Sequence, residues 1–217
     1  MITQEKYWDE RFKEGEIWGD SPCPSVDMSL PHFRDRHMHS ILVPGCGYGR
    51  NSFELAKKGF KVKGIDVSSE AIKLACRNIS AEIKNIEYKV EDILNPNVTS
   101  GNFDAIYLSN VLHLFLKDQR TLLMNHMNEQ LKPGGLMIFT CISTEDHKNY
   151  GVGEEIEENT FLHNDKSLHF YNEKEIAREL PPNFNVLERT LHNQTETDPA
   201  GNKEVLVLWF VAAKKVS

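Results

Sequence analysis

The amino-acid sequence predicts an α/β fold built on a largely parallel sheet. Three observations lead to this. Short apolar, β-branched runs alternate with helical patterns, a glycine-rich turn follows the first such run, and an acidic residue ends the second. Strands that alternate with helices are typical of βαβ units, whose crossover connections make the strands parallel. With 217 residues, 40% of them hydrophobic, the chain suits a single domain, 1–217, with a full core.

The elements follow in order from the apolar runs and their boundaries. Ser68 or Ser69 can cap the second helix, and the Pro133 and glycines of "LKPGG" end the third one and lead into a strand. We expect the last two strands to form an antiparallel pair joined by a polar loop, 190–204. The predicted strands are 40–44, 61–65, 86–90, 103–108, 136–141, 184–189 and 205–212, and the predicted helices before the last pair are 50–58, 68–83 and 117–131.

Two segments lie outside this alternation. The N-terminal arm, 1–39, is rich in aromatic residues, and the insertion 143–172 has no obvious periodicity of its own. A connection of that length is usually functional or mobile. Both segments flank strand ends on one side of the sheet, so we expect them to form lids over a site there.

Composition excludes several classes of partner. The net charge is −7, and the basic residues are interspersed with acidic ones, which argues against a nucleic-acid partner. The four cysteines are far apart without a C-x-x-C pair, and His37 and His39 have no third ligand at a matching interval, so we expect reduced thiols and no metal site. No signal-peptide core or membrane-length apolar run occurs. We therefore expect a soluble, cytoplasmic protein without a membrane partner, either a monomer or a homodimer.

The glycine-rich turn is the strongest functional signal. Gly45 and Gly47 let the backbone approach a ligand, and the helix that follows offers free amides. Asp66 ends the next strand, where it can accept hydrogen bonds from two ribose hydroxyls. A tight strand-to-helix turn without a ligand is the structural alternative. The pattern is G-x-G-x-G with Arg50 at the third glycine position of a dinucleotide fingerprint, and no G-K-[ST] string exists, which disfavours NAD and excludes a P-loop.

Five motifs in order resemble the class I S-adenosylmethionine-dependent methyltransferases. They are "VPGCGYG", "GIDVS", "VEDIL", "FDAIYLSNVLHLF" and "LKPGGLMIFT", which together cover most of 40–141. The resemblance implies a Rossmann-like, seven-stranded, mostly parallel sheet of order 3-2-1-4-5-7-6, with strand 7 antiparallel and helices on both faces. It also implies S-adenosyl-L-methionine as the cofactor.

A closer likeness is to the thiopurine, thiol and tellurite-resistance branch. Pro44 before the first glycine, the stretch "GCGYGRNSFELAKKGFKV" and the tail "DPAGNK…FVAAKK" are similar to it. Where that subfamily has a substrate-side His and Arg, this sequence has Thr195 and Glu196.

The resemblance assigns roles at the cofactor. Cys46 and the two glycines would line the methionine part, and Asp66 would bind the ribose. Val67 and Ile93 would enclose the adenine, with Asp92 at its amine, and Ser109 would face the methyl group or the carboxylate. The residues implied to bind the cofactor are Trp18, Pro44, Gly45, Cys46, Gly47, Asn51, Asp66, Val67, Asp92, Ile93 and Ser109.

Acceptor-side residues are fewer. His113, just past the fourth strand, is the candidate catalytic base because an ordinary histidine pKa suits proton removal at neutral pH; packing at a helix start is its structural alternative. We expect substrate contacts from Tyr7, Trp8, Asn110, His169 and Tyr171. The string "LSNV" replaces the N/D-P-P-[YFW] of nucleic-acid amino-methyltransferases, which favours a small-molecule substrate.

These patterns predict methyl transfer to a small acceptor, which we expect to be a thiol, selenol or similar soft nucleophile. Three alternatives stay open: an O- or N-methyltransferase of a small metabolite, a NAD-dependent oxidoreductase, and a protein that binds S-adenosylmethionine without turnover.

Overall fold

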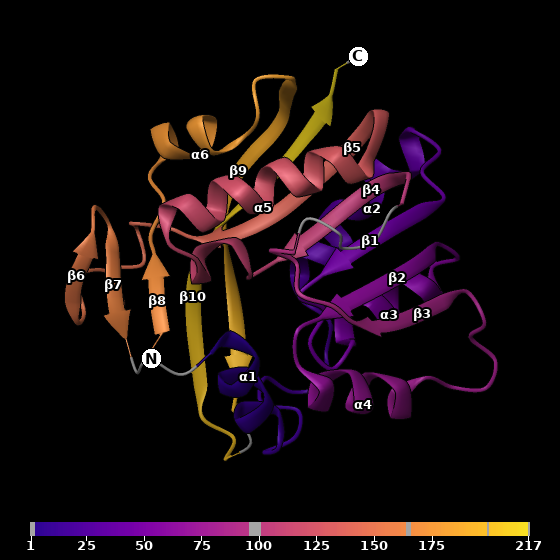
Figure 1. Cartoon of the computed structure of the whole chain (residues 1–217), viewed down its shortest axis with the longest axis horizontal. Coiled ribbons are helices and arrows are strands. Elements are labelled where there is room, and N and C mark those ends of the chain that lie inside the picture. The colour runs from indigo at the N-terminus through magenta and orange to yellow at the C-terminus, as the bar shows by residue number, and fades with distance from the viewer. Residues whose placement is uncertain (1–2, 96–100, 164–165, 199, 217) are drawn as a thin grey trace.

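The computed structural model describes residues 3–95, 101–163, 166–198 and 200–216. Its centre is a seven-stranded sheet of order β3-β2-β1-β4-β5-β10-β9, shown in Figure 1. The first five strands are mutually parallel, while β10 is antiparallel to both β5 and β9, which confirms the predicted fold. The strands are β1 (Ser40–Pro44), β2 (Lys61–Asp66), β3 (Ile86–Val90), β4 (Phe103–Ser109), β5 (Leu131–Ile142), β9 (Phe184–Thr197) and β10 (Lys203–Lys215).

Helices cover both faces of the sheet because the central strands are apolar on both sides. In β1, Ile41 and Val43 point to the face covered by α2 and α3, while Leu42 points to the face covered by α5 and α6. Figure 1 shows α5 lying across the front of the sheet. The helices are α1 (Gln4–Phe12), α2 (Pro24–Asp35), α3 (Arg50–Lys57), α4 (Ser69–Asn78), α5 (Lys117–Gln130) and α6 (Glu173–Glu179), with a 3-10 turn η1 (Leu112–Leu114) after β4.

The helix boundaries follow the expected caps, with one difference. Ser68 caps α4 by accepting from the Ala71 amide at 3.1 Å, as predicted. The prediction of a helix over 68–83 was too long, because Ile79 already has an extended conformation. β-Branched Ile79 and the following Ser80 are both weak helix formers.

The predicted loop 190–204 is mostly strand. β9 and β10 pair from Thr197 and Lys203 to Phe184 and Lys215, with one shift of register between Ala212 and Ala213, so the connection is much shorter than predicted. The strand was missed because the residues that alternate between buried and exposed are polar there: Gln194 and Glu196 are buried, and the residue between them is exposed. β10 pairs with β5 only from residue 208 onward, and the rest of the hairpin extends past the sheet toward α1 (Figure 1).

The insertion 143–172 forms a small antiparallel sheet rather than an irregular loop. Its strands are β6 (Glu154–Glu157), β7 (Thr160–His163) and β8 (Lys166–His169), in the order β6-β7-β8. Phe161, Leu168 and Phe170 pack with Ile142 and Leu208 in a separate apolar cluster. The insertion therefore has a core of its own, docked beside the ends of β5 and β10.

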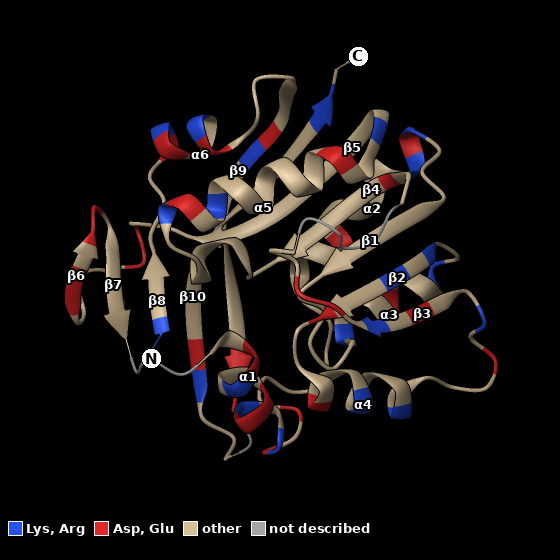
Figure 2. Ribbon diagram, viewed as in Figure 1, with Lys and Arg blue, Asp and Glu red and all other residues tan. Residues whose placement is uncertain are grey.

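No helix within the described residues is long and apolar enough to cross a membrane. Figure 2 shows that acidic and basic residues occur on most elements, with neither sign confined to one region.

Candidate active site

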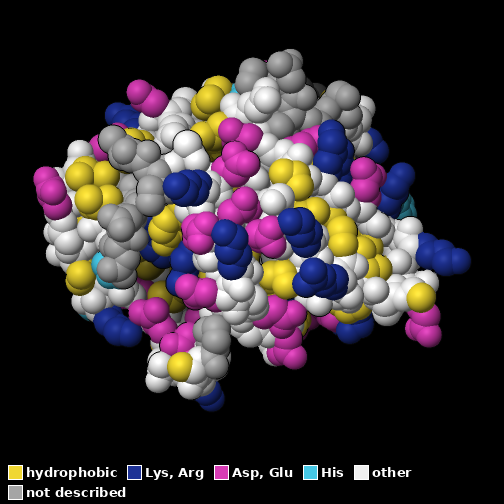
Figure 3. Space-filling model, turned by 60° about the horizontal axis from the view of Figure 1, so that its bottom comes forward, with side chains coloured by type: hydrophobic (Ala, Val, Ile, Leu, Met, Phe, Trp, Pro, Cys, Tyr) yellow, Lys and Arg dark blue, Asp and Glu magenta, His cyan; other side chains and the backbone are white. Residues whose placement is uncertain are grey.

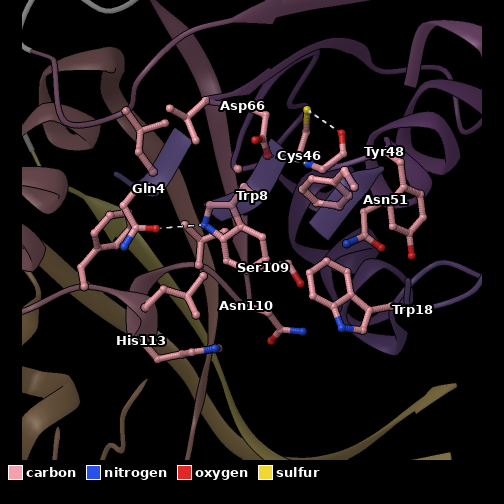
Figure 4. A pocket seen from close by; sticks show the side chains of 18 of the residues that line it. Gln4, Trp8, Trp18, Cys46, Tyr48, Asn51, Asp66, Ser109, Asn110 and His113 are labelled. Carbon is pink, nitrogen blue, oxygen red and sulfur yellow. Dashed lines mark hydrogen bonds between the residues drawn. The ribbon is translucent and has the colours of Figure 1, made fainter. Parts of the chain in front are cut away.

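A cavity of about 400 Å³ lies at the carboxyl ends of β1, β2 and β4. This is where open α/β sheets bind their ligands, because the strand order reverses at β1 and β4. α1 and the turn after it cover the cavity on one side, while Glu196 of β9 and Leu206 of β10 line it on another. Figure 4 shows side chains from α1, the turn after it, the glycine turn and the ends of β2 and β4 converging. The predicted site residues that line it are Trp8, Trp18, Gly45, Cys46, Gly47, Asn51, Asp66, Val67, Asp92, Ile93, Ser109, Asn110 and His113.

The glycine turn presents bare backbone to the cavity. Gly45 has φ +62°, and a Cβ there would lie 2.5 Å from Cγ2 of Val111, so only glycine fits. Gly47 has φ +55°, and a Cβ there would touch the Phe12 ring at 3.4 Å. The Cys46 amide donates to the carbonyl of Ile65 at 3.0 Å, which ties the turn to the end of β2.

Asp66 joins the glycine turn to the helix that follows β2. Its Oδ2 accepts from the Gly47 amide at 2.8 Å, and its Oδ1 accepts from the Ser68 amide at 2.9 Å. The residue is 7% exposed, and burial raises the pKa of its carboxyl to about 6, although these two hydrogen bonds act to lower it. Each oxygen keeps a lone pair for a further donor, so the carboxylate can serve a ligand as well as the turn.

A second group of side chains lines the cavity after β2 and β3. Val67 follows Asp66, and Asp92, Ile93 and Leu94 follow β3. Asp92 accepts from the Leu94 amide at 2.9 Å, which fixes the turn that carries it. This arrangement gives apolar walls with one carboxylate, suited to a flat ring with an amino group.

Aromatic residues of the arm cover one side of the cavity. The rings of Trp8 and Phe12 pack at 5.9 Å, and Trp18 stacks on Tyr48 at 6.4 Å. The indole of Trp8 donates to Gln4, which also lines the cavity. Asp9, the next residue of α1, accepts from the Ser68 hydroxyl at 2.6 Å and so docks α1 on the start of α4.

Arg50, at the start of α3, fastens the arm and β9 to the glycine turn. Its guanidinium donates to the carbonyl of Trp18 at 2.7 Å and forms an ion pair with Glu196 at 2.8 Å. The two side chains are only 12% and 10% exposed. Beside it, the amide oxygen of Asn51 accepts from the Cys23 amide at 2.8 Å. The sequence patterns gave no sign of this connection.

The chain turns sharply after β4. Asn110 has φ +58°, a conformation that non-glycine residues adopt rarely, and Thr140 holds it by donating to its side-chain oxygen at 2.8 Å. Positive-φ residues cluster at functional sites, where the surrounding structure enforces them. Ser109 shares a hydrogen bond with the same threonine at 3.3 Å.

His113 lies in the cavity, but its hydrogen bonding differs from that expected of a base. Its Nδ1 accepts from the Ile142 amide at 3.3 Å, so the neutral ring carries its proton on Nε2. Burial, helped by the charge of Lys166, lowers the pKa of His113 to about 3. At neutral pH the ring can donate a hydrogen bond into the cavity but is a poor proton acceptor.

Four predicted residues lie outside the cavity lining. Pro44 and Tyr7 do not reach it. His169 Nδ1 bonds to the Thr160 hydroxyl at 2.8 Å within the insertion sheet, and fully buried Tyr171 bonds to Glu179 of α6 at 3.3 Å. Both side chains are engaged in contacts around the insertion and do not line the cavity. Among the described residues no three His, Cys, Asp or Glu side chains gather as a metal site.

Sequence reasoning missed other lining residues. Gln4, Lys166 and Leu206 reach the cavity from α1, β8 and β10. Lys166 has no local signal, because only the fold of the insertion brings it there. Leu206 belongs to the predicted seventh strand, but the extent of the hairpin past the sheet could not be foreseen.

Comparisons with known proteins agree with this geometry. Residues 41–135 match a family model described as a methyltransferase domain. The putative methyltransferase YqeM of Bacillus subtilis is 28% identical over 147 residues, which cover 67% of this chain and 55% of that protein. The chain spans about half the length of the first curated relatives it matches.

Two solved structures are similar over most of the chain. A SAM-dependent methyltransferase from Methanosarcina mazei aligns with a TM-score of 0.72 and 27% identity, covering 86% of this chain and 98% of that one. TehB from Haemophilus influenzae aligns with a TM-score of 0.64 and 21% identity, covering 99% and 68%, a likeness that shows the fold alone. In sheet order, in the placement of its motifs and in the family model that residues 41–135 match, this chain is similar to the class I S-adenosylmethionine-dependent methyltransferases.

Proposed function

We propose that this protein transfers a methyl group from S-adenosylmethionine to a small molecule whose acceptor atom is a thiolate, a selenolate or a similar soft nucleophile. The observation that carries methyl transfer is the juxtaposition of the bare Gly45–Gly47 turn with the Asp66 carboxylate in one cavity, inside a segment that matches a methyltransferase domain. The acceptor part rests on the hydrogen bonding of His113.

The residues present fit the cofactor. The turn around Gly45 has no room for a Cβ and leaves the backbone open to the amino-acid end. Asp66 would hold the ribose, and Asp92 with Val67 and Ile93 would hold the adenine. When bound, S-adenosylmethionine supplies a methyl group on an electron-poor sulfonium. The protein then has to align the acceptor and exclude water.

Neither His113 nor Glu196, the two candidate bases among the described residues of the acceptor side, is well placed to accept a proton. His113 uses its Nδ1 lone pair on the Ile142 amide, and its low pKa makes it a weak proton acceptor. Glu196 is engaged in a buried ion pair with Arg50. An acceptor that reacts as a preformed anion, such as a thiolate, needs no base at this point, whereas a hydroxyl or ammonium group does.

The arm and the insertion support a small acceptor. Trp8 and Trp18 from the arm and Lys166 from the insertion line the cavity, so both segments would enclose a bound molecule. On the face in Figure 3, acidic and basic side chains are interspersed, which disfavours a polyanionic partner such as nucleic acid. We place the site in a single domain that uses the arm 1–39 and the insertion 143–172 as its cover.

Two measurements test the proposal. Calorimetric titration with S-adenosylhomocysteine should give saturable binding, and NAD should give none. Incubation with methyl-labelled S-adenosylmethionine and a panel of simple thiols should then yield labelled thioethers. Binding of NAD alone would remove the whole proposal, and binding without turnover of any acceptor would favour a sensor of the cofactor.

Amines are the second candidate acceptor. Two curated relatives are named as an EEF1A lysine methyltransferase, 32% identical over 131 residues, and a phosphoethanolamine N-methyltransferase, 32% identical over 119 residues. The same labelling assay therefore includes small amines, phenols and a lysine peptide. Transfer to one of these with none to a thiol would refute the soft-nucleophile part and leave methyl transfer intact.

A further inference from the structure

Lys166 brings a positive charge to the cavity from outside the central sheet. It begins β8, whose next residue, Ser167, donates from its hydroxyl to the carbonyl of Leu114 in η1 at 3.0 Å. This contact fixes the strand against the turn that carries His113. Lys166 is half-buried and lines the cavity, and no carboxylate of the described residues forms an ion pair with its amine.

His113 adds a directed hydrogen-bond donor to the same region. Because Nδ1 is occupied by the Ile142 amide, the remaining proton is on Nε2. Figure 4 shows the ring reaching into the cavity below Asn110. The side chain is 7% exposed, and no acceptor among the described residues bonds to its Nε2. A nearly buried donor without a partner requires an acceptor from a ligand or water.

The surrounding charges leave this region short of a counter-ion. Burial and the neighbouring charge of Arg11 lower the pKa of Lys166, whereas Glu204 raises it. Glu204 itself pairs with Lys148 at 3.1 Å. An anion next to the Lys166 amine would favour its charged form, since opposite charges within a few ångströms stabilise each other.

Apolar side chains frame the donor pair. Leu114, Phe115 and Leu206 line the cavity with it. In such surroundings a charge-assisted hydrogen bond is stronger than in water, and an unpaired charge is costly. The region is therefore suited to a small anionic group attached to a short apolar body.

We propose that Lys166 and His113 together bind a carboxylate on the methyl acceptor and so select anionic acceptors over neutral and cationic ones of the same size. The inference rests on the proposed function for its choice of thiols as probes. Lys166 acts as a specificity residue: its ammonium pairs with the carboxylate, while His113 Nε2–H donates to one of its oxygens. In this proposal the small insertion sheet positions Lys166 next to the acceptor.

The test uses three thiols that differ mainly in charge. They are 3-mercaptopropionate, 2-mercaptoethanol and cysteamine, titrated into the 217-residue protein saturated with S-adenosylhomocysteine. A charge-assisted contact predicts roughly tenfold to hundredfold tighter binding of the carboxylate than of the neutral thiol. Lys166→Met should abolish that preference without changing the affinity for S-adenosylhomocysteine, and Lys166→Arg should restore most of it. Lys73→Met, which removes an exposed lysine on α4, should leave it unchanged.

Equal affinity for the three thiols in the wild type would overturn the inference, as would a preference that survives in Lys166→Met. Turnover is scored separately with methyl-labelled S-adenosylmethionine. A Lys166-dependent carboxylate preference without thiol methylation would refute the soft-nucleophile function and keep the anion site. Methylation of all three thiols at similar kcat/KM would refute the anion site and keep the soft-nucleophile function.

Discussion

Replacing Arg50 with methionine should destabilise the protein substantially and loosen its cover. Arg50 is the link between the glycine turn, the arm and β9, through the Trp18 carbonyl and the Glu196 carboxylate. Methionine keeps much of the side-chain length but removes both interactions. Among the described residues, Glu196 then retains only the side-chain amide of Gln194 as a hydrogen-bond partner.

The magnitude follows from the burial of the pair. Removing one partner of a buried ion pair costs about 3–5 kcal/mol, because the other charge is left without compensation. Arg50 and Glu196 are 12% and 10% exposed, so water reaches them little, although the edge hairpin can relax. We therefore expect Arg50→Met to lower the free energy of unfolding by about 2–4 kcal/mol. For a chain of this size that corresponds to a Tm lower by roughly 5–15 °C.

Urea denaturation of four proteins measures the effect: wild type, Arg50→Met, Glu196→Met and the double variant. The double variant should recover part of the loss, with a coupling of about 1–3 kcal/mol, because no unpaired charge remains. Lys73→Met, which breaks the exposed Lys73–Glu70 pair, should change stability by about 0.5 kcal/mol or less. The reasoning would be refuted if the free energy of unfolding of Arg50→Met lay within about 0.5 kcal/mol of the wild-type value. It would also be refuted if the effects of the two single variants simply added in the double variant.

Three further predictions concern the cofactor end of the cavity. Asp66→Ala should weaken S-adenosylhomocysteine binding about a hundredfold or more by calorimetry, since charge-assisted bonds to the ligand disappear; unchanged affinity would mean that the ribose is misplaced. In the wild type, the pKa of Asp66 is about 6 without ligand, and hydroxyl donors of the ligand favour its ionised form over its protonated form. The affinity for S-adenosylhomocysteine should therefore fall as pH drops below about 6, and binding in that range should release protons. A flat pH profile between 5 and 7 would contradict this. Gly45→Ala forces a Cβ against Val111 at positive φ and should cost about 2–4 kcal/mol, whereas Gly59→Ala, at φ +97° in open space, should cost less; equal losses would show that the contact is irrelevant.

The pH dependence of stability at Asp66 has the opposite sign to that of a salt-bridged acid. Its folded pKa, about 6, lies above the unfolded value of 3.8, so the native state holds the proton more tightly. The stabilisation that this provides is complete below the unfolded pKa and is lost as pH rises through 6. A shift of about two units corresponds to roughly 3 kcal/mol of stability given up at neutral pH. At neutral pH the ionised Asp66 thus destabilises the fold, but it lines the cavity, where a ligand can donate hydrogen bonds to it.

The sheet and the cofactor end could be predicted because their signals are local. Apolar runs mark the parallel strands, and the backbone conformation at Gly45 and Gly47 admits few other residues. The carboxyl ends of parallel strands meet at one edge, which brings Asp66 and Asp92 beside the glycine turn without further information. Sequence order alone therefore places these groups.

The acceptor side could not be predicted in the same way. Lys166 reaches the cavity only because β8 docks on η1, a contact between segments far apart in the chain. Gln194 and Glu196 are buried polar residues, so a search for apolar alternation misses that end of β9. The protonated nitrogen of His113 depends on the Ile142 amide, and nothing in the motif around His113 specifies that partner.

The same three-dimensional dependence explains the unusual glycine spacing. In a dinucleotide fold the third glycine lets the helix pack closely on its strand. Here Gly49, one position earlier, lets the start of α3 lie close to β3 and α4, because a Cβ on it would lie 2.4 Å from the Tyr88 hydroxyl and 3.1 Å from Ala75. Position 50 is consequently free to carry a long side chain, and Arg50 points toward the arm and β9. The turn that would hold the cofactor is thereby bonded directly to the segments that cover it, so closure of the cover and order in the turn should depend on each other.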